Sequence, residues 1–123
     1  MSDVPVKILV VDDDEFTAEM TGMFLEMAGY DTVIAIGGMD ALDKIGTDPE
    51  ISLVLSDMNM PFMDGIQLFE DLRGQGFLQP FVLLTGEESA PLKLAHPNLD
   101  AVLTKNEELQ DKLPELVAEL LAR

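Results

Sequence analysis

The stretch ILVVDDDEF, residues 8–16, places a run of apolar, β-forming residues directly before three consecutive aspartates. An apolar run without polar interruption is typical of a strand that is covered on both faces, as in the parallel sheets of α/β proteins. Carboxylates that gather where a buried strand ends need an explanation. Each one alone can be a helix cap, because acidic side chains are favoured at the positive end of a helix.

The same pattern recurs along the chain. Apolar runs at 31–36, 51–57, 79–85 and 101–104 predict four further strands, and the segments between them have the periodicity of amphipathic helices. The run at 51–57 is apolar almost throughout, which predicts a central strand. Alternating strands and helices with right-handed crossovers predict an α/β fold, a doubly wound (βα)5 parallel sheet with helices on both faces.

The helical segments carry apolar side chains at three- and four-residue spacings, which we expect to face the core. In the first helix (15–30), with Gly29 as its C-terminal cap, these residues are Phe16, Met20, Met23, Phe24 and Met27. In the second (37–46) they are Met39, Leu42 and Ile45, and in the third (64–76), with Asp64 as N-cap, they are Ile66, Phe69 and Leu72. In the C-terminal segment they are Leu109, Leu113, Leu116, Val117, Leu120 and Leu121.

Prolines limit the two last helices. Pro91 and Pro97 oppose a continuous helix over 86–100, so we expect a turn or two at most. Pro114 is best tolerated in a first turn. The main C-terminal helix is therefore predicted to start near Leu113, after a separate turn at 107–111.

Length and charge exclude several classes of protein. The chain has 123 residues, which suits one domain, with 7 basic and 24 acidic side chains and a net charge of −17. Such a charge argues against nucleic acid or an anionic membrane as partner, since both need a cationic surface. There is no cysteine, and no segment approaches the length and apolarity of a membrane span. We therefore expect a cytoplasmic protein.

Polar residues at the ends of the predicted strands form a candidate site. Asp12 and Asp13 follow the first strand, Asp57 follows the third, Thr85 ends the fourth and Lys105 follows the fifth. The carboxyl ends of parallel strands meet at one edge, so these carboxylates converge and repel unless a cation lies among them. Mg²⁺ is the natural candidate. An aspartate can itself accept a phosphoryl group, which needs mainly positioning and charge stabilisation.

Four motifs of the sequence resemble those of a known protein family. VVDDD (10–14), LVLSDMNMPFMDG (53–65), VLLTGEE (82–88) and LTK (103–105), in this order and spacing, resemble the receiver domain of two-component response regulators. AIGGMDAL (35–42) also looks like the start of that family's second helix. The resemblance spans nearly the whole chain and implies one receiver domain over 1–123. It also implies the flavodoxin-like (CheY-like) sheet order 2-1-3-4-5.

The resemblance also implies roles for individual residues. Asp57 would be the phosphoacceptor, and Lys105 would pair with a phosphoryl oxygen. Mg²⁺, or Mn²⁺ or Ca²⁺ in its place, would be bound by the side chains of Asp13 and Asp57 and the backbone carbonyl of Asn59, with Asp12 acting through a water. Thr85 would swing towards the phosphate as a switch. Asn59 and Glu87 would tune the phosphate lifetime, and Gly86 would leave room beside the site.

The chain departs from the family pattern on the output side. Val102 stands where the family usually has an aromatic residue, and Asn106 replaces a common proline, so we expect ordinary signal input and unusual output. The implied partners are a histidine kinase or histidine phosphotransfer protein as phosphodonor, and an effector protein bound through 85–122. We expect a stand-alone receiver, as a monomer or weak dimer, that signals by protein contact and is not an enzyme in the usual sense.

Two other interpretations remain open. The altered region 85–112 also suits a receiver-like scaffold that works without phosphate, although the acidic residues and the lysine are all retained. A metal-dependent phosphohydrolase shares the aspartate nucleophile and Mg²⁺. That class usually has a second aspartate two residues after the nucleophile, where this chain has Asn59, and a cap domain for which the chain has no room.

Overall fold

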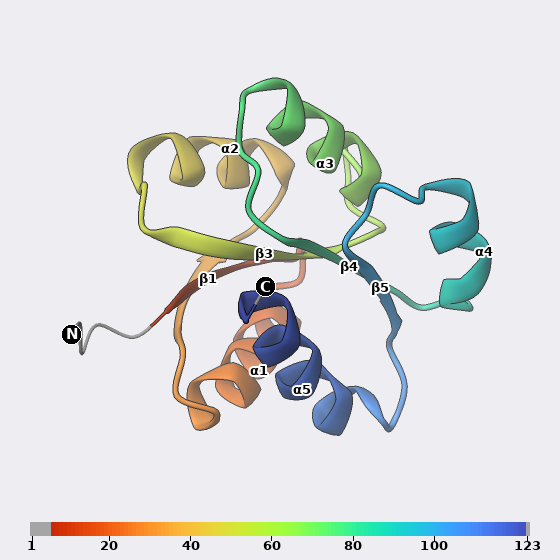
Figure 1. The fold of residues 1–123 in the computed structure, drawn as a ribbon. Coiled ribbons are helices and arrows are strands. Elements are labelled where there is room, and N and C mark those ends of the chain that lie inside the picture. The colour runs from red at the N-terminus through yellow and green to blue at the C-terminus, as the bar shows by residue number, and fades with distance from the viewer. Residues whose placement is uncertain (1–5, 123) are drawn as a thin grey trace.

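The computed structural model describes residues 6–122, so residues 1–5 and 123 of the expected domain lie outside the described part. It shows an open sheet between two layers of helices (Figure 1). The strands are β1 (Lys7–Val11), β2 (Asp31–Ala35), β3 (Ile51–Asp57), β4 (Phe81–Thr85) and β5 (Ala101–Thr104). The helices are α1 (Glu15–Met27), α2 (Gly38–Thr47), α3 (Gly65–Gly74), α4 (Ser89–Ala95) and α5 (Leu109–Leu121).

All neighbouring strands are parallel, in the order β2-β1-β3-β4-β5, which confirms the predicted fold and sheet order. β3 is the central strand, as its apolar sequence predicts. The strands also end at the same level. Val11 pairs with Ser56, Asp57 with Leu84 and Thr85 with Thr104, so the loops after β1, β3, β4 and β5 leave from one edge.

Each face of the sheet has its own apolar core. Leu9 and Val11 of β1 belong to the core on the side of α2 and α3, while Ile8 and Val10 belong to the core on the side of α1 and α5. Figure 1 shows these two layers of helices. All four residues of β1 are at most 2 % exposed. This alternation explains the uninterrupted apolar run, because a strand covered on both faces has no position left for a polar side chain. Within residues 6–122, no helix is long and apolar enough to cross a bilayer.

The predicted helix caps are present. Gly29 has φ +99°, and the N–H of Tyr30 donates to Leu25 O while the N–H of Gly29 donates to Glu26 O, which is the Schellman arrangement after α1. At the start of α3, the carboxylate of Asp64 accepts from the N–H of Gln67 at 2.8 Å, and the Gln67 side chain accepts from the N–H of Asp64 at 2.9 Å. These bonds satisfy backbone groups that a helix end leaves unpaired.

The prediction of which face of α1 lies in the core is wrong. Phe16, Met20, Met23 and Met27 are 71, 43, 58 and 81 % exposed, and Phe24 is only half-buried. The buried residues of α1 are Ala18, Thr21, Gly22 and Leu25. Small residues are needed here because α1 lies close to β2, where a Cβ on Gly22 would approach Thr32 Oγ1 to 3.3 Å.

Helices α2, α3 and α5 follow their predicted patterns, with one exception in α2. In α2, Leu42 and Ile45 pack on the core as expected, but Met39 is 68 % exposed. In α3, Ile66, Phe69 and Leu72 are buried as expected. The apolar stripe of α5 also packs as predicted, with Leu113, Val117 and Leu120 buried.

The lengths of α4 and α5 test the proline arguments. α4 has 7 residues with Pro91 in its first turn, so the prediction of a short helix is confirmed. The predicted start of α5 is wrong, because the helix begins at Leu109 and contains Pro114. The N–H groups of Asp111 and Lys112 both donate to Glu108 O, which builds the first turn before the proline. Packing of Leu109 and Leu113 on the core then favours one continuous helix over a broken one.

Candidate functional site

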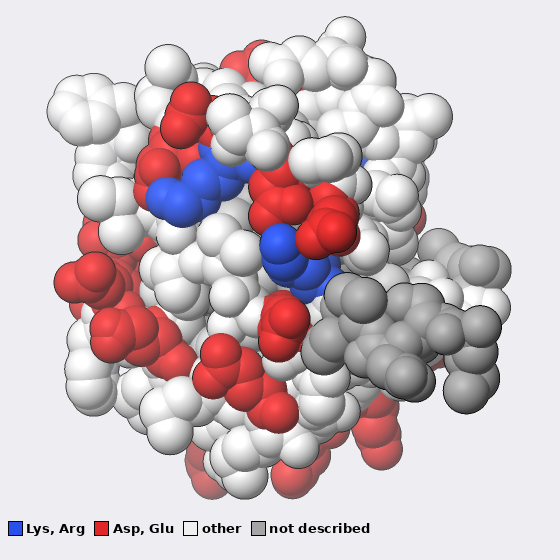
Figure 2. Space-filling view, turned by 90° about the vertical axis from the view of Figure 1, so that its left-hand side faces the viewer, with Lys and Arg blue, Asp and Glu red and all other residues white. Residues whose placement is uncertain are grey.

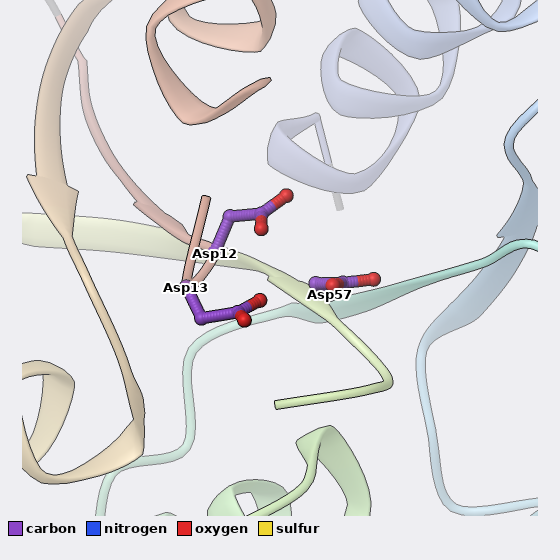
Figure 3. A group of neighbouring side chains, drawn as sticks. All are labelled: Asp12, Asp13 and Asp57. Atoms are coloured by element: carbon purple, nitrogen blue, oxygen red, sulfur yellow. The ribbon is translucent and has the colours of Figure 1, made fainter. Parts of the chain in front are cut away.

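Three carboxylates meet at the carboxyl edge of the sheet (Figure 3). Asp12 and Asp13 come from the end of β1 and Asp57 from the end of β3, and each offers an oxygen within 4.8 Å of the others. Asp12 and Asp57 are 5 and 8 % exposed, whereas Asp13 is exposed. The expected convergence is therefore observed, and it follows from the sheet order, which sets β1 beside β3.

Burial acts on Asp12 in particular. It raises the pKa of this carboxyl above the ordinary value, and the nearby charges of Asp57 and Asp13 raise it further. The backbone N–H of Asp14, which donates to Asp12 Oδ1 at 2.9 Å, and the Lys105 ammonium act in the opposite direction. Burial is the largest of these effects, so the pKa of Asp12 is raised overall.

Asp14 has a different role. Its carboxylate accepts from the Phe16 N–H and from the Thr17 hydroxyl, so it is the N-cap of α1. The hydrogen bond from Thr17 is the main cause of its lowered pKa. Of the three consecutive aspartates, two therefore belong to the cluster and the third is a cap, which was the structural alternative for all of them.

Lys105 brings the positive charge into the pocket. Its Nζ lies 2.7 Å from Asp57 Oδ1 and 3.6 Å from Asp12 Oδ2. Its backbone N–H donates to Thr85 O at 2.7 Å, which fixes the residue at the end of β5 against β4. One ammonium against three carboxylates leaves an excess of negative charge. Oxygen ligands in this number and spacing fit a hard divalent cation such as Mg²⁺.

The loop after β3 turns back sharply over the strand end. The Met58 N–H donates to Leu84 O at 2.8 Å, and the Gly65 N–H donates to Met58 O at 2.9 Å. A Cβ on Gly65 would lie 2.7 Å from the carbonyl oxygen of Asp57 and would overlap Leu83, so only glycine lets the loop close. Asn59 lies exposed in this loop, two residues after Asp57.

The loop after β4 places the predicted switch residues. Thr85 is 1 % exposed, and its hydroxyl accepts from the Glu87 N–H at 3.1 Å. The Thr104 hydroxyl accepts from the Ser89 N–H at 3.1 Å and ties the start of α4 to β5. Gly86 and Glu87 are exposed, and a Cβ on Gly86 would meet no atom within 4 Å. The structure therefore leaves open space at Gly86.

Val102 lies three residues before Lys105 and pairs in register with Leu83 of β4. It is half-buried and packs against the core on the side of α2 and α3. None of the 7 residues of α4 is buried. The surface formed by α4 and β5 therefore has few buried side chains, and it carries the aliphatic Val102 where the resemblance leads us to expect an aromatic residue.

One residue near the site was not singled out by its sequence. Phe62, in the loop after β3, has φ +69° and is 104 % exposed. The sequence does not indicate that Phe62 is exposed, because its neighbours Met60, Pro61 and Met63 are apolar too and the segment resembles a buried run.

An open sheet in the order 2-1-3-4-5 whose carboxyl edge gathers aspartates and a lysine defines the receiver class of signalling domains. The chain belongs to the response regulator receiver domain family, whose model matches residues 8–117. The family suggested by the four motifs is therefore confirmed.

Relatives and solved structures agree. The response regulator MprA of Mycobacterium tuberculosis is 40 % identical over 120 residues, which are 96 % of this chain and 48 % of MprA, so the chain spans about half the length of this relative. The Francisella response regulator 1452 receiver domain superposes with a TM-score of 0.85 at 33 % identity, covering 97 % of this chain and 98 % of that one. For Thermotoga maritima TrrA, solved in complex with Mg²⁺ and BeF, the TM-score is 0.83 at 29 % identity, covering 93 and 97 %.

Proposed function

We propose that the chain is a phosphorylation-dependent switch in which Asp57 accepts a phosphoryl group from a phosphohistidine. The observation that carries this proposal is the position of the Lys105 ammonium, 2.7 Å from Asp57 and 3.6 Å from Asp12, within a cluster of three carboxylates. An oxygen of Asp57 forms the new bond to phosphorus, and the histidine nitrogen leaves. Lys105 is then in place to pair with a phosphoryl oxygen as a point charge.

The metal of this reaction would be Mg²⁺, with Mn²⁺ or Ca²⁺ as substitutes. Asp13 and Asp57 would bind it through their side chains, Asn59 through its backbone carbonyl and Asp12 through a water. The bound ion supplies positive charge to the phosphoryl oxygens. The three carboxylates beside a single ammonium support this proposal, and so does the likeness to TrrA, a receiver-fold neighbour solved with Mg²⁺ and BeF.

The switch would act through Thr85. Its hydroxyl now accepts from the Glu87 N–H, and it would donate its own proton to a phosphoryl oxygen after phosphorylation. Moving towards the phosphate would release Glu87 and pull on the loop before α4, which has no buried residue to resist. Asn59 and Glu87 would tune the access of water to the phosphate, and Gly86 would leave space for the group.

The partners follow from this scheme. We propose a histidine kinase or a histidine phosphotransfer protein as donor, and an effector protein that binds region 85–122 of the one receiver domain, 1–123. The net charge of −17 argues against nucleic acid and against anionic membranes. A cytoplasmic location and a monomer or weak dimer would suit this role.

Mass spectrometry tests the reaction. The wild type is incubated with acetyl phosphate, with and without Mg²⁺, beside the isosteric variant Asp57→Asn. We expect a labile phosphate mass on the wild type in the presence of Mg²⁺ only. Equal labelling of Asp57→Asn, or labelling that does not depend on Mg²⁺, would refute the assignment of the site.

Val102 and the weakly anchored α4 support a second candidate, a receiver-like scaffold that works without phosphate. Amide hydrogen exchange with and without beryllofluoride separates the two. The phosphorylation switch predicts changed exchange over residues 85–112, whereas an unchanged pattern there would favour the scaffold.

A further inference from the structure

An apolar patch lies beside the acidic cluster, on the loops that follow β2 and β3 and on the first turn of α2. We refer to it as the Phe62 patch, and its members are Ile36, Met39, Pro61, Phe62 and Met63. They surround a hollow of about 240 Å³ whose lining also includes Asp13 of the cluster. Ile36, Met39 and Phe62 are 57, 68 and 104 % exposed. The hollow is therefore open to solvent and borders the proposed phosphorylation site.

The fold alone does not account for Phe62. Its φ of +69° is the only positive φ of a non-glycine residue in the described part of the chain, and a bulky side chain is unfavourable there. Its ring is fully exposed, so the folded domain gains no burial in return. Glycine or asparagine would suit this backbone better. Phe62 therefore has an unfavourable backbone conformation and an exposed ring, and neither stabilises the isolated domain. We take this as an indication that Phe62 has a role outside the domain.

The shape of the hollow favours a protein side chain over a small molecule. It is far larger than the roughly 30 Å³ that a water molecule takes up in the liquid. It is smaller than the roughly 300–1,000 Å³ of a pocket that encloses a small ligand, and three of its apolar walls are mostly exposed. A shallow apolar hollow of this kind suits one large anchor side chain of a protein partner.

The charges indicate what must accompany that anchor. The two charged residues that line the hollow, Asp13 and Asp40, are both acidic. Asp40 is paired with Lys44 at 2.8 Å, whereas Asp13 belongs to the acidic cluster. Figure 2 shows the side where β1 begins, away from the Phe62 patch, and there too acidic side chains are spread widely while the basic ones form small groups beside them. A second copy of the chain, also at −17, or an anionic membrane would be repelled.

We propose that the Phe62 patch is a docking surface for a protein segment that presents a large apolar side chain with lysine or arginine beside it. The apolar side chain enters the hollow against Phe62 and Met39, and the cation lies towards Asp13. This goes beyond the proposed function, because docking uses residues outside the phosphoryl site except Asp13 and needs no phosphoryl transfer.

Methionine methyl NMR tests the proposal, because methionines mark both the Phe62 patch and the exposed side of α1. Met39 and Met63 report on the Phe62 patch, and Met20, Met23 and Met27 report on α1. The probe is a helical peptide with leucines at i and i+4 among lysines, and its control has serines in place of the leucines. We expect the leucine peptide to shift the Met39 and Met63 methyl signals, and the serine peptide to shift them far less.

Two variants complete the test. Phe62→Asn should lower the affinity for the leucine peptide by about tenfold, while Phe16→Asn, which removes an exposed phenylalanine from α1, should leave it unchanged. Asparagine tolerates positive φ, so Phe62→Asn should melt no lower than the wild type. The proposal is overturned if the peptide shifts only the α1 methionines or none, if both peptides bind equally, or if both variants behave alike. Labelling by acetyl phosphate should be unchanged in Phe62→Asn, which separates this inference from the proposed function.

Discussion

Replacing Lys105 with methionine removes the only ammonium that contacts the acidic cluster in the described part of the chain, and keeps most of the side-chain volume. Lys105 lies 2.7 Å from Asp57 and 3.6 Å from Asp12. At an effective dielectric constant of about 20, opposite charges 4 Å apart attract by about 4 kcal/mol before the cost of removing them from water. The cluster would lose that attraction and keep its internal repulsion.

The exposure of the partners sets the net effect. Breaking a fully buried ion pair costs about 3–5 kcal/mol, and an exposed pair contributes about 0–1 kcal/mol. The side chain of Lys105 is 28 % exposed and those of Asp57 and Asp12 are 10 and 7 % exposed, so the pocket lies between these limits. We expect Lys105→Met to lower the unfolding free energy by about 2 kcal/mol in EDTA.

Urea unfolding in EDTA and in excess Mg²⁺ measures this. Mg²⁺ should stabilise Lys105→Met more than the wild type, because binding of the ion relieves a larger excess of negative charge in the variant. The control is Lys112→Met, which removes an exposed pair with Glu108 at 3.1 Å and should cost about 0.5 kcal/mol or less. Equal costs for the two variants in EDTA, or a cost for Lys105→Met that does not change with Mg²⁺, would refute the electrostatic account.

Three further predictions concern stability. The first concerns Asp12, whose pKa is raised in the folded protein. In EDTA, at a pH between the ordinary and the raised pKa, the folded state therefore holds more protons than the unfolded state. The contribution of Asp12 to the unfolding free energy should then grow as the pH falls through this window. Thermal melts of Asp12→Asn should lack this part of the pH dependence, and identical profiles for wild type and variant would contradict it. Gly65→Ala should lower the unfolding free energy by about 2 kcal/mol, because the added Cβ would overlap Asp57 O and Leu83. The control Gly74→Ala, which places the Cβ in open space, should be neutral or stabilising. Chemical unfolding compares the two variants, and similar unfolding free energies would contradict the packing argument. Pro114→Ala should raise the unfolding free energy by about 1 kcal/mol, because proline is costly in a helix interior and alanine restores the N–H inside α5. A lower midpoint of unfolding for the variant would contradict this.

The strands and the site were predictable for related reasons. A parallel strand buried on both faces admits only apolar residues, so the run at 51–57 could be read directly as β3 and as central. Once the strands are known, their carboxyl ends fix where Asp12, Asp13, Asp57 and Lys105 meet. Asp64 was predictable as a cap because its role depends only on the next three residues.

The errors concern what one helix cannot show by itself. The stripe from Phe16 to Met27 has the spacing of a core face, but the sheet packs against the opposite side, where Ala18 and Gly22 allow close approach. Likewise, Pro114 signals a break that the packing of Leu109 and Leu113 overrides. Spacing identifies a stripe, and only the neighbouring element decides whether that stripe is buried.

The central claim is that Asp57 carries the phosphoryl group, and borohydride trapping tests it most directly. Borohydride reduces an acyl phosphate to an alcohol, so phosphorylated aspartate becomes homoserine, which peptide mass spectrometry locates. After treatment with acetyl phosphate and Mg²⁺, we expect homoserine at position 57 and aspartate at positions 12 and 13. Homoserine at 12 or 13, or unmodified aspartate at 57, would contradict the account.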